Sequence, residues 1–496
     1  MIDTVSQPDA GLDYLLLSDV HLGSDIIPHI RPWARTSWLL QDAAIDAQLA
    51  SFLDHHREHV AAGRRWCLVL AGDFIDLVGV ALAPEQDAVR TPPTREEVQH
   101  GLGSAADHVV QKLNAIAARH VTVFRALSRF VAAGHSIVLV RGNHDIELHW
   151  RAAQRAFVSA IVQHGPAHEA EACRARICVK PWFFAVEGVL YVEHGHEFDS
   201  MCSYGNPLLP TCEIDTRRIR PTPFSVLLRQ VARPTVGLSS ASYSYAGMGA
   251  YVRLLGNLGL RGSLQIAVRY TRACTRLVQA SYQRAVDGGR RHVRRTEVLV
   301  RRFARASGVS PATLSSLRAL YVTPAAQSFN FIIRNLYIDR IFSVALALVF
   351  FAAAAAFAVL ATRSALYGAA AFALPGLCLG GFACIGRGTN SSPSNVMREA
   401  ADHIAGLMGT PWVVMGHVHE PVCIATPSGA TYVNLGSWGH DDPPDEPASA
   451  HHSACTFLTL RREGQGFVGE LCAWDMERGA VAFAPTPPAH DGALAH

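Results

Sequence analysis

The chain has 496 residues, a net charge of +3 and 49% hydrophobic residues. It is long for one domain and has enough apolar material for a sizeable core. Its 11 cysteines form no CxxC pairs, which argues against a zinc-finger site. The polar, acidic stretch before Leu15 is unlike a secretory signal. These features favour a cytosol-facing protein whose cysteines are reduced and mostly structural.

Five short apolar runs each lead into Asp, Asn or His, at residues 15–17, 67–71, 136–140, 189–192 and 412–415. Helical periodicity is expected between the first three runs, over 42–59 and 96–133. This alternation of strands and helices predicts a layered α/β core. Polar groups delivered at several strand ends predict a metal site along one edge of a sheet.

The five-run pattern stops after His196 and resumes near Pro411, so about 200 residues form an inserted unit. The expected organisation is a first part of the core domain, a basic helical insertion, a transmembrane hairpin, a second part of the core domain and a flexible tail. The corresponding ranges are 1–200, 201–340, 341–387, 400–475 and 479–496.

Charge is distributed unevenly along the chain. Residues 201–340 contain 21 Arg, no Lys and 5 acidic residues, which gives about +16 there and about −13 elsewhere. A solvated helical face would explain the arginines but not the scarcity of acidic partners. We prefer a surface that faces the membrane or captures a phosphorylated substrate. Nucleic acid is not expected, because no recognition motif is present and aromatic residues do not interleave with the arginines.

Two uncharged apolar runs follow, at 341–362 and 365–386. Each exceeds the roughly 20 residues needed to cross a bilayer, which predicts a two-helix transmembrane hairpin. Arg334, Arg340 and Arg387 flank the pair, so the positive-inside rule places the catalytic domain at the cytoplasmic face of the cell membrane.

The polar groups at the run ends are carboxylates, imidazoles and an amide, which suit Mn²⁺, Fe²⁺ or Zn²⁺. Any one such motif is a weak signal, but five in this order predict a metal site. Two ions about 3.5–4 Å apart can share a carboxylate and hold a hydroxide that attacks phosphorus. The motifs are Asp19-x-His21, Gly72-Asp73-x-x-Asp76, Gly142-Asn143-His144-Asp145, His194-Gly195-His196 and Gly416-His417-x-His419.

In this order the motifs resemble those of the calcineurin-like metallophosphoesterases. Residues 432–438 are also similar to the strand and turn that follow the last motif in that family. The resemblance covers about 1–200 and 400–475. It implies a four-layer α/β sandwich, in which two mixed sheets are flanked by helices, with two divalent ions at the strand ends. Mn²⁺ is the first choice of metal, with Fe or Zn as alternatives.

The resemblance also implies a role for each matching residue. His144 would bind the phosphate and protonate the leaving oxygen, with Asp145 orienting it. Asp76 is interpreted instead as a cap of the turn after its strand, and His196 as a residue supporting the ligands. The implied ligands are Asp19, His21 and His419 for the first metal, Asp73 as the bridge, and Asn143, His194 and His417 for the second metal.

Within the family, the chain is distantly similar to UDP-2,3-diacylglucosamine pyrophosphatases, which insert a helical cap between the fourth and fifth motifs. It departs from them at His144, where they typically carry Arg, and at His196, where they usually carry Asp. The resulting prediction is a membrane-anchored, metal-dependent phosphoesterase acting on a phosphoester or pyrophosphate, with a lipid-linked substrate as one option. Two alternatives stay open: an anchored phosphodiesterase or phosphatase of soluble nucleotides, and a catalytically inactive membrane scaffold.

Overall fold

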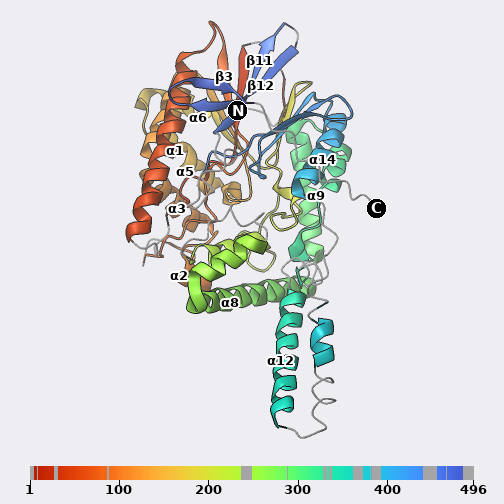
Figure 1. Cartoon of the computed structure of the whole chain (residues 1–496). Coiled ribbons are helices and arrows are strands. Elements are labelled where there is room, and N and C mark those ends of the chain that lie inside the picture. The colour runs from red at the N-terminus through yellow and green to blue at the C-terminus, as the bar shows by residue number, and fades with distance from the viewer. Residues whose placement is uncertain are drawn as a thin grey trace.

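The computed structural model places two mixed β-sheets at the centre of the molecule, with helices on both sides (Figure 1). The structure describes residues 5–7, 9, 11–26, 32–85, 89–235, 248–287, 289–327, 332–333, 338–360, 373–379, 381, 392–439, 455–464 and 466–483. The predicted α/β class with two mixed sheets is confirmed.

The larger sheet has seven strands in the order β13-β12-β11-β2-β3-β4-β5, and the smaller has six in the order β1-β6-β7-β8-β10-β9. Strands β2, β3 and β4 are parallel neighbours in the larger sheet, as are β7, β8 and β10 in the smaller. The bounds are β1 (Val5–Ser6), β2 (Leu12–Leu17), β3 (Arg65–Leu70), β4 (Ser136–Val140), β5 (Ile177–Lys180), β6 (Phe184–Val186), β7 (Leu190–Val192), β8 (Trp412–Met415), β9 (Val422–Ala425), β10 (Thr431–Asn434), β11 (Thr456–Glu463), β12 (Gly466–Asp475) and β13 (Gly479–Ala482).

Helices flank the sheets and make up most of the described insertion. Their bounds are α1 (Pro32–Glu58), α2 (Arg95–His100), α3 (Ala106–Arg119), α4 (Val121–Ala132), α5 (Arg151–Val162), α6 (Ala170–Ala175), α7 (Pro223–Leu227), α8 (Met248–Asp287), α9 (Gly289–Ser307), α10 (Pro311–Ala319), α12 (Ile338–Leu360) and α14 (Pro393–Met408). Short helical turns are η1 (Ile146–His149), η2 (Ala167–Glu169), η3 (His196–Phe198), η4 (Leu228–Ala232, a π-helix) and η5 (Ala325–Gln327).

The single helical pattern expected over 96–133 is divided into three helices. Gly101 ends α2 with φ of 94°, and His120 separates α3 from α4 with φ of −105° and ψ of 38°. The buried His120 ring explains the second break, because it ties this point to two other segments. Its Nε2 accepts a hydrogen bond from Gly23 N at 2.9 Å, and its Nδ1 lies 2.7 Å from the Asp46 carboxylate.

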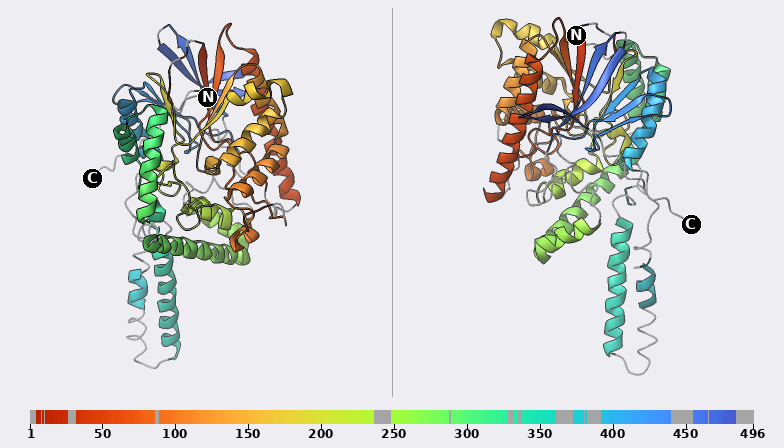
Figure 2. Two further views of the ribbon diagram at one scale, coloured as in Figure 1. Left: turned by 180° about the vertical axis from the view of Figure 1, so that it is seen from behind. Right: turned by 45° about the horizontal axis from the view of Figure 1, so that its top comes forward.

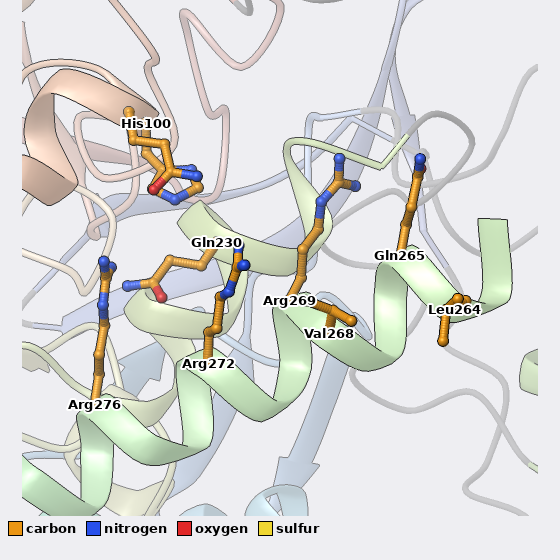
Figure 3. A pocket seen from close by; sticks show the side chains of 9 residues that line it. His100, Gln230, Leu264, Gln265, Val268, Arg269, Arg272 and Arg276 are labelled. Atoms are coloured by element: carbon orange, nitrogen blue, oxygen red, sulfur yellow. The ribbon is translucent and has the colours of Figure 1, made fainter. Parts of the chain in front are cut away.

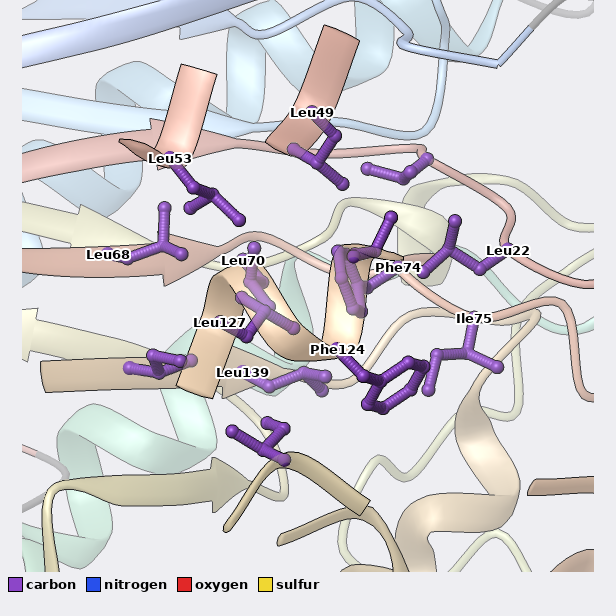
Figure 4. Packing of buried hydrophobic residues seen from close by; sticks show 14 of the residues in the cluster. Leu22, Leu49, Leu53, Leu68, Leu70, Phe74, Ile75, Phe124, Leu127 and Leu139 are labelled. Atoms are coloured by element: carbon purple, nitrogen blue, oxygen red, sulfur yellow. The ribbon is translucent and has the colours of Figure 1, made fainter. Parts of the chain in front are cut away.

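Alternation along β2 divides the core into two layers. Leu15 and Leu17 pack in the cluster beneath the helices of the larger sheet, whereas Tyr14 and Leu16 pack between the two sheets. Successive strand residues point to opposite faces, and a strand covered on both faces reads as a continuous apolar run. Figure 4 shows the helix-side cluster around Leu70 of β3. Full burial of each such side chain contributes roughly 1.5–3 kcal/mol.

The outer face of the smaller sheet is covered in the same way. Ala401 and Ile404 of α14 belong to one buried cluster with Val413 and Met415 of β8. The layers therefore run helices, larger sheet, smaller sheet, helices. This order brings the carboxyl ends of the parallel strands of both sheets to one edge of the sandwich.

The insertion extends beyond this sandwich. Helix α8 lies crosswise below the sandwich in Figure 1, and α12 projects away from the sandwich in all views (Figures 1 and 2). The first expected membrane span is 341–362. Residues 341–360 of this span belong to α12, and residues 361–362 lie outside the described part of the chain. The second span, 365–386, lies outside the described part except for 373–379 and 381. Within the described part of the chain, no helix has both the length and the apolar character that crossing a membrane requires.

The C-terminal prediction needs a correction. The segment from 479 was expected to be a flexible tail, but its first residues form β13. This strand pairs antiparallel with β12, Gly479 opposite Asp475 and Ala482 opposite Cys472. Alternating small and apolar residues suit an edge strand here. Residues 484–496 lie outside the described part of the chain.

Candidate metal centre

The candidate centre lies where the carboxyl ends of β2, β3 and β4 meet those of β7 and β8. Backbone hydrogen bonds hold the loops after these strands together: His21 N donates to Asp73 O at 2.9 Å, and Gly416 N donates to His194 O at 2.9 Å. Hydrogen bonds also cross between the two sheets: His417 N donates to the Asp19 carboxylate at 3.1 Å, and Trp438 N donates to Asp19 O at 3.0 Å. The backbone therefore fixes the relative position of residues far apart in sequence.

Left-handed backbone conformations concentrate at this centre. Six non-glycine residues in the described part of the chain have positive φ, and five are site residues: Asp19 (54°), His21 (55°), Asp73 (52°), His417 (72°) and His419 (59°). This conformation is uncommon for residues other than glycine, although Asp and His tolerate it better than most. Strained backbone of this kind clusters at functional sites.

Glycines precede several site residues because the backbones approach closely. A Cβ added to Gly72 would lie 2.4 Å from His194 Nδ1, and one added to Gly142 would lie 2.1 Å from an Asp73 carboxylate oxygen. The side chains of His194 and Asp73 are both buried and cannot move aside to make room for such a Cβ. The Gly-Asp and Gly-Asn pairs of the sequence therefore allow the motifs to converge.

Asp19, His21 and His419 form the first group of converging side chains. Asp19 Oδ1 lies 3.1 Å from His419 Nε2 and 3.8 Å from His21 Nε2. The two imidazole Nε2 atoms are 3.4 Å apart. The three residues offer ligand atoms close enough to hold one metal ion, and they are the three expected for the first metal.

The second group is built on His194. Its Nδ1 donates to Ala71 O at 2.9 Å, so in the neutral ring Nε2 is an acceptor. This Nε2 faces an Asp73 carboxylate oxygen at 3.1 Å and Asn143 Oδ1 at 3.2 Å. Three acceptors pointing at one another are stable only when a proton or a cation lies between them.

Asp73 lies between the two groups. Its carboxylate belongs both to a set with His21 and His144 and to a set with Asp19 and His194, and each set is compact enough for a metal ion. It also accepts a hydrogen bond from His144 N at 2.8 Å. The bridging role implied by the sequence stays a prediction, but the position fits it.

The charges of the site are strongly coupled. Burial favours the neutral form of Asp19, but His194 and His419 outweigh it and lower the pKa of Asp19 to about 2. Burial disfavours the charged form of His194, but Asp73 and Asp19 outweigh it and raise the pKa of His194 to about 9. Burial lowers the pKa of His21 to about 4. The carboxylates therefore stay ionised over the neutral range, as metal ligands must.

His417 lies beside His194, but its Nε2 faces a carboxylate outside the group expected for the second metal. Its Nε2 is 3.2 Å from the Asp199 carboxylate, and His417, Asp199 and Cys202 form another set that could hold an ion. The His417 and His194 rings are neighbours, with centroids 5.3 Å apart. The sequence did not predict Asp199 and Cys202 as site residues, because they follow η3 and belong to no recognisable motif. Their proximity in sequence to His196 was the one signal available.

The partner of the His144 imidazole differs from the expectation. His144 Nδ1 lies 2.7 Å from the Asp76 carboxylate, whereas Asp145 accepts backbone hydrogen bonds from Gly142 at 2.6 Å and Phe74 at 3.1 Å. The orienting role assigned to Asp145 is therefore wrong in this structure: Asp145 shapes the loop, and Asp76 holds the ring. Burial, with Asp73, raises the pKa of Asp145 to about 7.

Asp76 makes an ion pair in addition to the predicted cap of its turn. It caps the following turn by accepting from Gly79 N at 2.7 Å, and it also pairs with Arg233, which follows η4 in the insertion. Arg233 in turn donates to Ser24 O at 2.7 Å. Burial favours a neutral Asp76, but Arg233 and His144 hold the pKa of its carboxyl well below the usual range. The inserted unit thus contributes directly to the environment of His144.

His196 is buried beside His194, with ring centroids 5.5 Å apart. Neither of its ring nitrogens makes a hydrogen bond within the described structure. Burial, reinforced by His194, holds the pKa of His196 well below its usual range. His196 is therefore a neutral ring packed beside His194, and the supporting role interpreted from the sequence stays a prediction.

The donor set fits divalent cations. It combines buried carboxylates, neutral-capable imidazoles and an amide oxygen, which are ligands for first-row divalent ions. Atoms that can bind a metal face one another in both groups, at His21 with His419 and at His194 with Asn143. Several buried groups of this chain could therefore hold a metal ion.

Comparison with protein-family models gives no match for the chain, and comparison with curated proteins gives none.

Proposed function

We propose that this chain is a metal-dependent phosphoesterase that hydrolyses a phosphoester or pyrophosphate bond. The observation that carries the proposal is the position of Asp73, which shares compact ligand sets with side chains that follow β2, β4 and β7. The resemblance of the five motifs to the calcineurin-like metallophosphoesterases supports the same reaction class. We propose two divalent ions, with Mn²⁺ the first to test.

When bound, a pair of divalent ions supplies an activated water nucleophile and neutralises charge on the phosphoryl oxygens. The side chains of the protein orient the proton donor. Because His144 Nδ1 faces Asp76, its Nε2 is the nitrogen left to contact a phosphoryl or leaving-group oxygen. The His144 ring lies beside the ligand set, with its centroid 4.5 Å from that of His21. We therefore propose His144 as the proton donor and Asp76 as the residue that positions it.

Metal removal tests the proposal. Treating the full-length protein with EDTA should lower turnover of an aryl phosphodiester by roughly a hundredfold or more, because the ions supply both nucleophile and charge neutralisation. Adding Mn²⁺ should restore the rate, whereas adding Ca²⁺, which prefers more oxygen ligands and longer distances, should not. Metal content is measured alongside by elemental analysis. Full turnover by metal-free protein would contradict the proposal.

We propose further that the segment 341–387 attaches the protein to the membrane. Support comes from its two uncharged runs and from apolar side chains that α12 leaves exposed: Leu348 and Val349 are each 63% exposed, and Phe351 is 39% exposed. Exposed apolar groups gathered on one projecting helix are typical of a surface that another apolar phase covers. This location would give access to lipid-linked substrates as well as soluble ones.

A deletion of 341–387 tests the attachment. The deleted protein should move from the membrane fraction to the supernatant after alkaline extraction while keeping its turnover of a soluble phosphodiester. The deletion should not extend back to residue 221, because Arg233 pairs with Asp76 and its loss would perturb the candidate centre itself. Recovery of the deleted protein in the membrane fraction would contradict the attachment. Comparing phospholipids with nucleotides as substrates then separates the lipid-linked from the soluble alternative.

A further inference from the structure

A basic cavity lies between the insertion and α2, separate from the candidate metal centre. It has a volume of about 400 Å³ and lies between α2, η4 and α8. Figure 3 shows Arg269, Arg272 and Arg276 extending from one side of α8 toward His100 and Gln230. Residues three and four apart share one face of a helix, so the three guanidinium groups line one wall together.

The residues that line this cavity carry positive charge, and Glu96, the carboxylate that acts on His100, is itself paired with Arg229 at 3.2 Å. The lining consists of Gln99, His100, Gln230, Leu264, Gln265, Val268, Arg269, Arg272 and Arg276, so it includes no carboxylate. The Arg276 Nη1 atom is buried and has no hydrogen-bond partner in the described structure. A buried charged donor without a partner is costly, which indicates that the cavity is built to receive an acceptor.

The position of the wall is fixed by neighbouring contacts. Arg269 donates to Pro234 O at 2.9 Å and to Thr235 Oγ1 at 3.0 Å. On the opposite side, Arg229 of η4 donates to Gly101 O at 2.8 Å, just past the end of α2. These contacts hold α8, η4 and α2 together, so the donors are arranged before any ligand arrives.

We infer that this cavity is a binding site for a phosphate group, carried either by a free phosphate or by an anionic lipid headgroup. Guanidinium groups form bidentate, charge-assisted hydrogen bonds with phosphate oxygens, and the glutamine amides add neutral donors. None of the lining residues belongs to the candidate metal centre, so the site is additional to the proposed reaction. Its connection to that centre is η4, which contributes Gln230 to the cavity and is followed by Arg233, the partner of Asp76.

Calorimetric titration of inorganic phosphate into EDTA-treated, full-length protein tests the first source, because metal removal prevents phosphate from binding at the metal centre. The double variant Arg272→Gln/Arg276→Gln should bind phosphate roughly tenfold or more weakly, since charge-assisted hydrogen bonds are lost. The matched control is Arg301→Gln/Arg302→Gln, which removes the same charge from exposed positions of α9. A second variant, Gln265→Glu, adds a carboxylate at an exposed lining residue and should weaken binding without removing an arginine.

Vesicle flotation tests the second source. Equimolar phosphatidylcholine and phosphatidic acid are compared with phosphatidylcholine alone, and the readout is the extra binding to the anionic vesicles. Weakened phosphate binding in the Arg272/Arg276 and Gln265 variants, but not in the control, identifies free phosphate as a ligand. Loss of the extra vesicle binding alone identifies a lipid headgroup. If the variants match the control in both arms, the inference is overturned, whatever the outcome for the proposed hydrolysis.

Discussion

Replacing Asp73 with asparagine is expected to lower turnover of an aryl phosphodiester by roughly a thousandfold and to abolish metal loading. The substitution keeps the shape of the side chain but removes its negative charge. Asp73 lies 3.1 Å from His194 Nε2 and belongs to ligand sets on both sides. Loss of a single group that stabilises transition-state charge costs about 10²–10³-fold, and a shared ligand should cost at least as much. Turnover and elemental analysis measure the effect.

Asp54→Asn is the matched control for this substitution. Asp54 is a half-buried carboxylate in surface ion pairs with Arg57 and Arg129, and such pairs contribute about 0–1 kcal/mol. The control should load metal and turn over substrate like the unaltered chain. If neither Asp73→Asn nor the unaltered chain turned over substrate on added Mn²⁺, the catalytically inactive scaffold would be the better description.

Replacing His144 with glutamine is expected to lower kcat by roughly 10²–10⁴-fold, the usual contribution of a general acid. Metal content is measured alongside, because His144 also belongs to a set with His21 and Asp73 that could hold an ion, and a variant that loads metal normally excludes that role. An aryl phosphate with a good leaving group needs less protonation, so the loss should be smaller on it than on an alkyl phosphate. That dependence on the leaving group distinguishes proton donation from a structural effect.

His149→Gln serves as the control for His144→Gln. His149 lies in the neighbouring turn η1, stacked edge-on against Trp150 with ring centroids 5.0 Å apart. It should retain nearly full turnover on both substrates. Equal losses for the alkyl and aryl phosphates in His144→Gln would contradict proton donation and indicate a role in positioning.

Much of the fold and site could be predicted because both depend on local patterns. A strand that is covered on both faces is a continuous apolar run, as residues 136–140 are, and can be recognised in the sequence. The polar residues that follow each run can then be recognised as candidate site residues. Asp19, His21 and His419 converge as the resemblance implied. Neighbouring parallel strands have their carboxyl ends at one edge of a sheet. The sheet topology therefore brings the polar residues that follow these strands together.

Contacts that depend on the insertion could not be predicted. Arg233 reaches Asp76 from 157 residues away, and no local pattern identifies which of the 21 arginines in the segment 201–340 does so. Asp145 was assigned to His144 because it is adjacent in sequence, yet its oxygens are taken up by Gly142 and Phe74. Sequence adjacency was a poor guide because the loop turns the Asp145 carboxylate inward.

The left-handed ligand positions have a consequence for engineering. At Asp19, Asp73 or His417, glycine would relieve an unfavourable φ, whereas the native side chain is the one the proposed chemistry needs. A library selected only for heat resistance should therefore drift toward glycine at these positions and lose metal affinity. Thermal tolerance and metal retention should be selected together, because selection for one of them alone favours a different residue at these positions.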